Sequence, residues 1–209
     1  MRSKLPRPIP SKIVCIGRNY AEHAKELNNP IPTSPLLFIK TANSVVPFEK
    51  PIAVPTAHGS CHHELEIALL MGEKGIAGVG LALDLTLRDL QDKLKAKGHP
   101  WEKAKAFDGA CPLSEFVAVD EGLRGELGNL NLELRRNGAQ QQCGNSSQML
   151  TPVPALLEEI AQYFTLLPGD VVLTGTPAGV GPLYSGDELE AVLSTASGEV
   201  LLSLKTHVV

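Results

Sequence analysis

Three acidic residues have a spacing that suits a metal site. Glu64 and Glu66 stand two residues apart in a stretch of period-two alternation, so both carboxylates project from one face of a strand. Asp84 lies on the polar face at the end of a second alternating stretch. If the two strands are neighbours, the three carboxylates converge, and oxygen-only ligands suit Mg²⁺, Mn²⁺ or Ca²⁺. A solvated acidic strand face has the same pattern and, on spacing alone, explains it more often.

His23 and Glu26 could form a general base. They stand three residues apart in a short predicted helix and therefore share a face. A carboxylate beside an imidazole fixes its tautomer and raises its basicity. Ordinary surface pairs on helices have this spacing as well, so both interpretations stay open.

Several other polar residues could hold a substrate. Arg88 and Gln91 share a helix face just after Asp84, and a guanidinium can bind a carboxylate through two hydrogen bonds. An exposed face with an ordinary Asp84–Arg88 ion pair is the alternative. Thr176 lies in the glycine-rich stretch 175–181, whose amides could cradle an anion or simply form a tight turn. This loop matches neither common nucleotide-binding motif.

The histidines beside the acidic pair and one lysine are less distinctive. His62 shares the face of the glutamates and could contact a ligand-binding group, whereas His63 shares the leucine face and is predicted to be a core residue. Lys105 is one lysine among several in its segment, and nothing local sets it apart.

Periodicity and turn residues predict the elements that position these side chains. Predicted strands cover residues 13–16, 36–39, 61–70, 81–86, 130–135 and 171–174, with a hairpin turn at Asn137-Gly138. The first predicted helix covers residues 20–27 and is stopped by residues 28–30. The second follows an N-cap at Thr86 and ends near Gly98. The third follows an N-cap at Thr151 and has Pro152 at its first helical position. Short strands without βαβ alternation favour an α+β protein with strongly bent sheets.

Composition excludes several classes of protein. The chain has 209 residues, a formal net charge of −4 and 43% hydrophobic residues, which excludes a disordered chain and disfavours nucleic acid as a partner. No apolar run reaches the ~18 residues of a membrane span, and no secretory signal is recognised. The four cysteines lack C-x-x-C spacing, which favours reduced thiols in a cytoplasmic protein. We expect an extended arm over residues 1–11 and a single catalytic domain over 12–209.

Six segments, taken in order, resemble the fumarylacetoacetate hydrolase family in its short, single-domain branch. They are GRNYAEHAKE (17–26), PLLFIK (35–40), HHELEIALLMG (62–72), LALDLTLRDLQ (81–91), KGHPWEKAKAFDGACP (97–112) and LLPGDVVLTGTPAGVGPL (166–183). The resemblance implies a mixed β-sheet rolled on itself with a few short helices, and a homodimer. Relatives usually have a longer segment between Glu66 and Asp84, so the chain is either shortened there or lacks a segment.

The resemblance also implies roles for individual residues. Mg²⁺ or Mn²⁺ would be bound by the three carboxylates, Glu64, Glu66 and Asp84. The catalytic residues would be His23, Glu26 and Lys105, and the substrate-binding residues would be Arg18, Arg88, Gln91, Lys105 and Thr176.

The function expected first is hydrolysis of a carbon–carbon bond in acylpyruvates, which are 2,4-diketo acids. His23 would deprotonate a water molecule, and the cation would stabilise the enolate that cleavage leaves. Decarboxylation or tautomerisation of oxaloacetate and isomerisation of a larger diketo acid are alternatives within the family. A non-catalytic metal-binding module is the alternative outside it, although such a module would not need His23 and Glu26.

Overall fold

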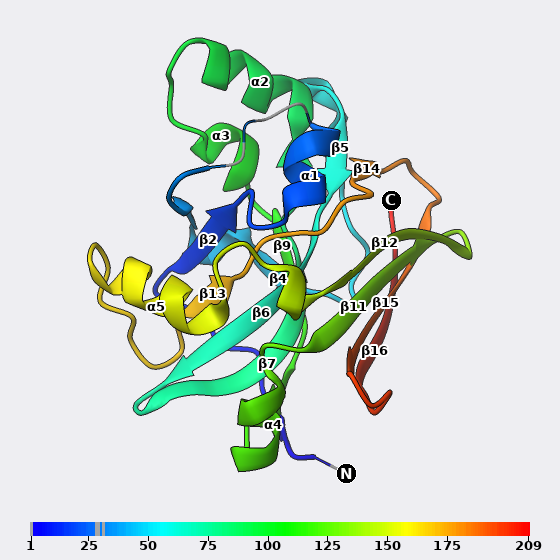
Figure 1. Cartoon of the computed structure of the whole chain (residues 1–209). Coiled ribbons are helices and arrows are strands. Elements are labelled where there is room, and N and C mark those ends of the chain that lie inside the picture. The colour runs from blue at the N-terminus through cyan, green and yellow to red at the C-terminus, as the bar shows by residue number, and fades with distance from the viewer. Residues whose placement is uncertain (1, 28–29, 31) are drawn as a thin grey trace.

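The computed structural model describes residues 2–27, 30 and 32–209 and shows three β-sheets with short helices around them (Figure 1). The largest sheet has nine strands, in the order β1-β10-β7-β6-β13-β2-β3, with β9 paired to β7 and β4 paired to β9. Both parallel and antiparallel pairs occur in it. The predicted α+β fold with mixed, bent sheets is confirmed.

The nine strands of the large sheet have these bounds: β1 Lys4–Leu5, β2 Ile13–Gly17, β3 Leu36–Lys40, β4 Val45–Pro47, β6 Leu65–Gly72, β7 Gly75–Leu83, β9 Cys111–Leu113, β10 Phe116–Ala118 and β13 Val171–Leu173. Its centre is the β6–β7 hairpin, in which Leu65 pairs with Leu83 and Gly72 with Gly75. The tight turn predicted near residues 72–75 is therefore present, and it joins the two strands directly. This register brings the start of β6 beside the end of β7, where the acidic residues lie.

Both faces of the large sheet are buried, which explains its nearly continuous apolar strands. In β2, Ile13 and Cys15 belong to one hydrophobic cluster, whereas Val14 and Ile16 belong to the other and larger one. The larger cluster also includes the inward residues of the four-stranded sheet. Two apolar layers thus hold the central strands rigidly.

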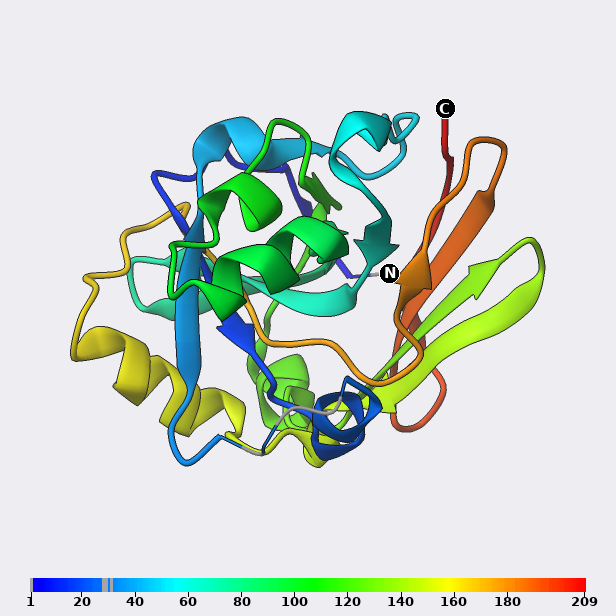
Figure 2. The same cartoon turned by 90° about the horizontal axis from the view of Figure 1, so that it is seen from above.

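The four-stranded sheet stands at an angle beside the large one (Figure 2). Its order is β12-β11-β15-β16, with bounds β11 Leu130–Arg136, β12 Ala139–Asn145, β15 Glu188–Thr195 and β16 Val200–His207. Asn137 and Gly138 both have positive φ, 52° and 79°, so the predicted hairpin turn is confirmed. A third sheet joins β5 Cys61–His63, β8 Thr86–Leu87 and β14 Gly181–Pro182.

Five α-helices are present in the described residues: α1 Ala21–Glu26, α2 Arg88–Ala96, α3 Glu102–Lys105, α4 Glu121–Glu126 and α5 Val153–Ala161. Short 3₁₀ turns cover Ala42–Ser44, Thr56–His58 and Ser146–Gln148. Helices α1, α2 and α3 gather at one end of the large sheet, at the top of Figure 1. The helix predicted over 20–27 is present, although part of its predicted stop, residues 28 and 29, lies outside the described residues.

Two predicted helix caps are wrong. Thr86 belongs to β8, and α2 begins at Arg88 after Leu87; the Thr86 hydroxyl donates to the Asp84 carbonyl at 3.0 Å instead of capping a helix. Thr151 does not cap α5, because the helix begins one residue later than predicted: the extended Pro152 is at the N-cap position and α5 starts at Val153. The Thr151 backbone N–H donates to the Asn19 side chain at 2.8 Å. Both residues make hydrogen bonds to groups outside the predicted helices instead. None of the helices in the described part of the chain is long and apolar enough to cross a membrane.

Candidate active site

The three carboxylates meet in a pocket between the large sheet and helices α1, α2 and α3. One oxygen from each of Glu64, Glu66 and Asp84 can be chosen so that all three lie within 4.8 Å of one another, and all three residues are buried. Glu64 and Glu66 flank the first residue of β6, and Asp84 follows the last residue of β7. Strands β6 and β7 are therefore neighbours, which is the condition under which the sequence predicted that the three carboxylates converge.

Two basic residues compensate the negative charge of Glu64. The Lys105 ammonium lies 2.8 Å from Glu64 Oε2 and 2.5 Å from Asp84 Oδ2, and Arg88 Nη2 donates to Glu64 Oε1. Burial raises the pKa of Glu64, but Lys105 and Arg88 outweigh it and hold that pKa well below its usual range. Burial likewise lowers the pKa of Lys105, yet Asp84 and Glu64 raise it overall, so Lys105 stays protonated.

Glu66 is the carboxylate that lacks a cation. It is 1% exposed and makes no ion pair with any residue that the structure describes, and its Oε2 accepts a hydrogen bond from the Gly175 backbone at 2.7 Å. Burial raises its pKa well above the usual range, and the charges of Asp84 and Glu64 add to this. An uncompensated buried carboxylate beside two others fits a hard divalent cation.

A buried lysine supports the site from behind. Lys40, at the end of β3, is 0% exposed, and its Nζ lies 2.8 Å from Asp84 Oδ1. It also donates to the carbonyls of Ala110 at 3.0 Å, of Leu85 at 3.3 Å and of Lys105. It thereby ties β3 to Asp84 and to the last residue of α3.

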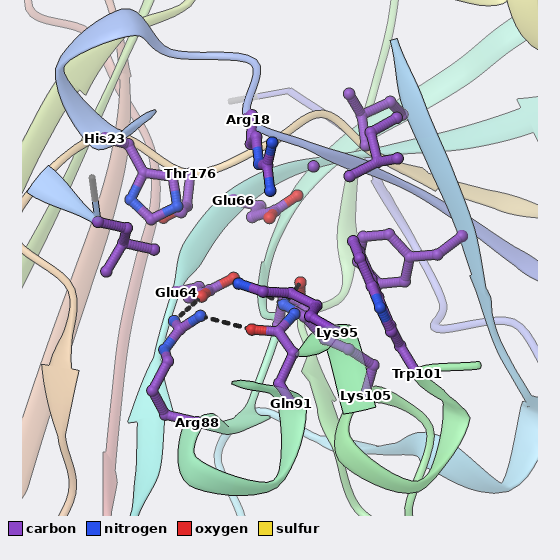
Figure 3. Close-up of a pocket in the computed structure, with 16 residues that line it drawn as sticks. Arg18, His23, Glu64, Glu66, Arg88, Gln91, Lys95, Trp101, Lys105 and Thr176 are labelled. Atoms are coloured by element: carbon purple, nitrogen blue, oxygen red, sulfur yellow. Dashed lines mark hydrogen bonds and ion pairs between the residues drawn. The ribbon is translucent and has the colours of Figure 1, made fainter. Parts of the chain in front are cut away.

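His23, on α1, lines the same pocket and pairs with Glu26 of the same helix (Figure 3). His23 Nδ1 lies 3.4 Å from Glu26 Oε2, and Glu26 accepts hydrogen bonds from the Gly179 backbone N–H at 3.0 and 3.2 Å. Burial lowers the pKa of His23, so the neutral imidazole predominates near pH 7. With Nδ1 facing Glu26, Nε2 is the atom left to act on a substrate.

Arg88 and Gln91 orient each other on the first turns of α2. Arg88 Nη1 donates to Gln91 Oε1 at 2.8 Å, and both side chains line the pocket. Since the amide oxygen faces Arg88, the Gln91 NH₂ group is left to donate to a bound molecule. Arg88 pairs with Glu64 and not with Asp84, so the alternative i,i+4 ion pair is absent from the described ion pairs.

The hydroxyl of Thr176 is already engaged. It donates to the Leu65 carbonyl at 2.8 Å and accepts from Gln142 Nε2 at 2.7 Å. Gln142 Oε1 in turn accepts from the Leu65 N–H at 2.9 Å and lies 3.0 Å from Nδ1 of His63, which is buried as predicted. The hydroxyl proton of Thr176 is therefore used within the protein, and the substrate contact expected for Thr176 stays a prediction.

Lys40 and Gln142, which hold the site together, were not predicted from the sequence. Lys40 lies in the motif at 35–40, where a lysine ending an apolar strand is a usable signal for a buried charge partner. Gln142 lies in a run of three glutamines, Gln140–Gln142, and nothing in the sequence separates it from its neighbours. His62, which was predicted to share the glutamate face, is half-buried. Its burial, and to a smaller extent the positive charge of Arg88, lower its pKa to about 4.

This architecture matches a known family. The family model described as fumarylacetoacetate (FAA) hydrolase, C-terminal, matches residues 12–209. The chain belongs to the fumarylacetoacetate hydrolase family. The predicted resemblance is therefore confirmed.

Relatives of two kinds are similar to this chain. Oxaloacetate tautomerase YcgM of Escherichia coli (strain K12) is 50% identical over 190 residues, and the match covers 86% of this chain and 86% of that protein. A crystal structure from Oleispira antarctica, of the fumarylacetoacetate isomerase/hydrolase type, has a TM-score of 0.93 and 56% identity over 96% of this chain and 94% of that one. The structure of a fumarylpyruvate hydrolase from Pseudomonas aeruginosa in complex with Mn²⁺ and pyruvate has a TM-score of 0.82 and 30% identity, and the match covers 96% of this chain and 90% of that one.

Proposed function

We propose that this protein interconverts the keto and enol forms of oxaloacetate or a closely related 2-oxo acid. The observation that carries the proposal is the His23 imidazole, paired with Glu26, in the same pocket as three buried carboxylates. The 50% identity to an oxaloacetate tautomerase supports it. The tautomerase alternative is thereby favoured over acylpyruvate hydrolysis, the function expected first from the sequence.

The carboxylates of Glu64, Glu66 and Asp84 would hold a divalent cation, Mg²⁺ or Mn²⁺. When bound, the cation supplies a Lewis acid that polarises the 2-oxo group and favours negative charge on its oxygen. The relative with bound Mn²⁺ and pyruvate supports this assignment. Ca²⁺ also suits such ligands and is a weaker candidate.

His23 moves the proton. In the keto form a C3 hydrogen is acidic, and Nε2 of the neutral imidazole takes it while the electron pair shifts toward the C2 oxygen. The imidazolium then returns its proton to that oxygen, directly or through water, which completes the enol and leaves His23 neutral again; the reverse sequence regenerates the ketone. Glu26, held by the Gly179 N–H, stabilises the imidazolium in between.

Cationic and amide donors hold the acid. Arg88, Gln91 and Lys105 surround the carboxylate cluster, and the Gln91 NH₂ group makes no hydrogen bond to the residues that the structure describes. Lys105, which stays protonated, donates to oxygen and does not act as a base. Small 2-oxo acids offer the matching acceptors, a carboxylate and an adjacent carbonyl.

Proton NMR with oxaloacetate and, separately, acetylpyruvate tests the proposal. A tautomerase accelerates exchange between keto and enol oxaloacetate without forming pyruvate, whereas a decarboxylase forms pyruvate and CO₂. A hydrolase converts acetylpyruvate to pyruvate and acetate. The proposal fails if keto–enol exchange of oxaloacetate is no faster with the protein than with the metal ion alone.

Acylpyruvate hydrolysis is the second candidate, supported by the similarity to the fumarylpyruvate hydrolase. The same base would then activate water instead of taking a C3 proton, so the two functions share His23 and Glu26. We further propose a homodimer, which size-exclusion chromatography with light scattering would test.

A further inference from the structure

Arg18 is the cation of the pocket that lacks a carboxylate partner. It lines the pocket, is half-buried, and makes no hydrogen bond or ion pair with any residue in 2–27, 30 or 32–209. The other basic side chains of the pocket are all paired: Arg88 with Glu64, Lys105 with Glu64 and Asp84, and Lys95 with Asp92 at 3.2 Å. A half-buried guanidinium without an anionic partner in the protein can bind an anionic group of a ligand.

The backbone holds Arg18 in a conformation that arginine disfavours. Its φ is 61°, in the left-handed region, and such outliers persist only where the surroundings fix them. The buried side chain of Asn19 fixes this one: its Nδ2 donates to the carbonyls of Thr174 at 2.9 Å and Thr151 at 3.1 Å, and its Oδ1 accepts from the Thr151 N–H at 2.8 Å. Unfavourable backbone geometry that places a side chain at an active site indicates a function for that side chain.

The position of Arg18 suggests which anion it binds. In Figure 3 Arg18 points toward Glu66 from one side of the two glutamates, whereas Arg88 and Gln91 approach from the opposite side. An acid whose 2-oxo-carboxylate end lies at the carboxylate cluster, as the proposed function requires, has its remaining atoms free to reach toward Arg18. A second carboxylate there would complete an ion pair with the unpaired guanidinium.

We propose that Arg18 is a specificity-determining residue that selects dicarboxylic 2-oxo acids over monocarboxylic ones by binding the carboxylate remote from the 2-oxo group. For oxaloacetate this is the C4 carboxylate. The inference rests on the proposed function for the orientation of the substrate.

Two inert ligands that differ only at C4 test the proposal by calorimetry in saturating Mg²⁺. Malate carries a C4 carboxylate, and 2-hydroxybutanoate carries a methyl group in its place. In the Arg18→Gln variant the Kd for malate should rise about 10- to 100-fold, the range for loss of a charge-assisted, two-bond carboxylate contact. The Kd for 2-hydroxybutanoate should stay within about twofold, because that ligand has no group for Arg18.

Two further variants separate charge from backbone geometry. Arg18→Gly removes the guanidinium and relieves the positive φ, so malate selectivity should disappear without a fall in Tm. Arg18→Lys should restore part of the selectivity, since an ammonium keeps the charge but not the paired hydrogen bonds. Selectivity that survives in Arg18→Gly, or an equal loss of affinity for both ligands in Arg18→Gln, overturns the assignment to Arg18. Wild-type protein with no preference for malate also overturns the assignment to Arg18, whereas wild-type protein without keto–enol activity in the NMR assay overturns the proposed function itself.

Discussion

Replacement of the buried Lys40 by methionine measures how strongly the carboxylate cluster depends on its internal cations. Methionine keeps most of the side-chain volume but removes the charge and every hydrogen bond that Nζ donates. Lys40 is fully buried, with Nζ 2.8 Å from Asp84 Oδ1 and 3.0 Å from the Ala110 carbonyl. Its loss therefore leaves the charge of a buried carboxylate less compensated and removes one donor from each of three carbonyls, of which the Ala110 carbonyl still accepts from the Leu85 N–H at 3.0 Å.

The expected magnitude follows from these contacts. Breaking a buried ion pair from one side costs about 3–5 kcal/mol. Because the Lys105 ammonium stays 2.5 Å from the other oxygen of Asp84, we expect the lower end of this range. In a chain of this size about 3 kcal/mol lowers Tm by about 6–12 °C.

Thermal unfolding followed by circular dichroism, without divalent cations, is the assay. Lys205→Met is the matched control: it removes a lysine 2.5 Å from Glu190 at an exposed site and should leave Tm unchanged. The double variant Lys40→Met/Asp84→Asn removes both charges and should recover part of the loss. A Tm for Lys40→Met equal to that of wild type would refute the reasoning.

Two further predictions concern the base and its support. Because burial lowers the pKa of His23, protonation disables the base only below its ordinary value of about 6.5, so kcat/KM for oxaloacetate should be flat above that pH and fall below it. His23→Gln should lower kcat about 10²- to 10⁴-fold and abolish that acidic limb; an unchanged limb would contradict the assignment. Gly179→Ala would place a Cβ 1.9 Å from the Gln141 carbonyl oxygen, so the loop must shift and release Glu26. We expect a loss of kcat of up to about 10²-fold. Gly169 also has a positive φ, 91° against 99° at Gly179, but a Cβ added there meets no atom within 4 Å, so Gly169→Ala should keep full kcat. Equal losses in the two alanine variants would refute the role of the loop.

Local sequence patterns predicted much of the framework of the site. Alternation placed Glu64 and Glu66 on one face, and the end of the next alternating stretch placed Asp84 nearby, because side-chain direction in a strand follows sequence parity. Whether the strands were neighbours could not be read locally, and only the β6–β7 ladder settles it. The same spacing suits a solvated acidic face, so burial decided between the two interpretations.

The charge partners could not be predicted because they come from distant segments. Lys40 reaches Asp84 across 44 residues, and Gln142 reaches Leu65 across 77, the second from a different sheet. The failed cap at Thr86 has the same origin: its hydroxyl is shared between the Asp84 carbonyl and the Lys105 ammonium, a partner that local sequence does not reveal. Helix α3 was missed because its four residues are too few to show helical periodicity. Helix α4 has six residues, as many as the predicted α1, but two of them are the glycines Gly122 and Gly125, which disfavour a helix.

The most direct test of the central claim is the rate of enol-to-keto conversion of oxaloacetate, followed by the loss of enol absorbance, in wild type and in Glu66→Gln. With Mg²⁺ or Mn²⁺ present, wild type should accelerate the conversion well beyond the metal-only rate, and a chelator should abolish the acceleration. Glu66→Gln, which keeps the side-chain shape but removes one carboxylate of the cluster, should show little acceleration at the same cation concentration. Equal acceleration by the variant, or by chelator-treated wild type, would contradict a cation-dependent tautomerase at Glu64, Glu66 and Asp84.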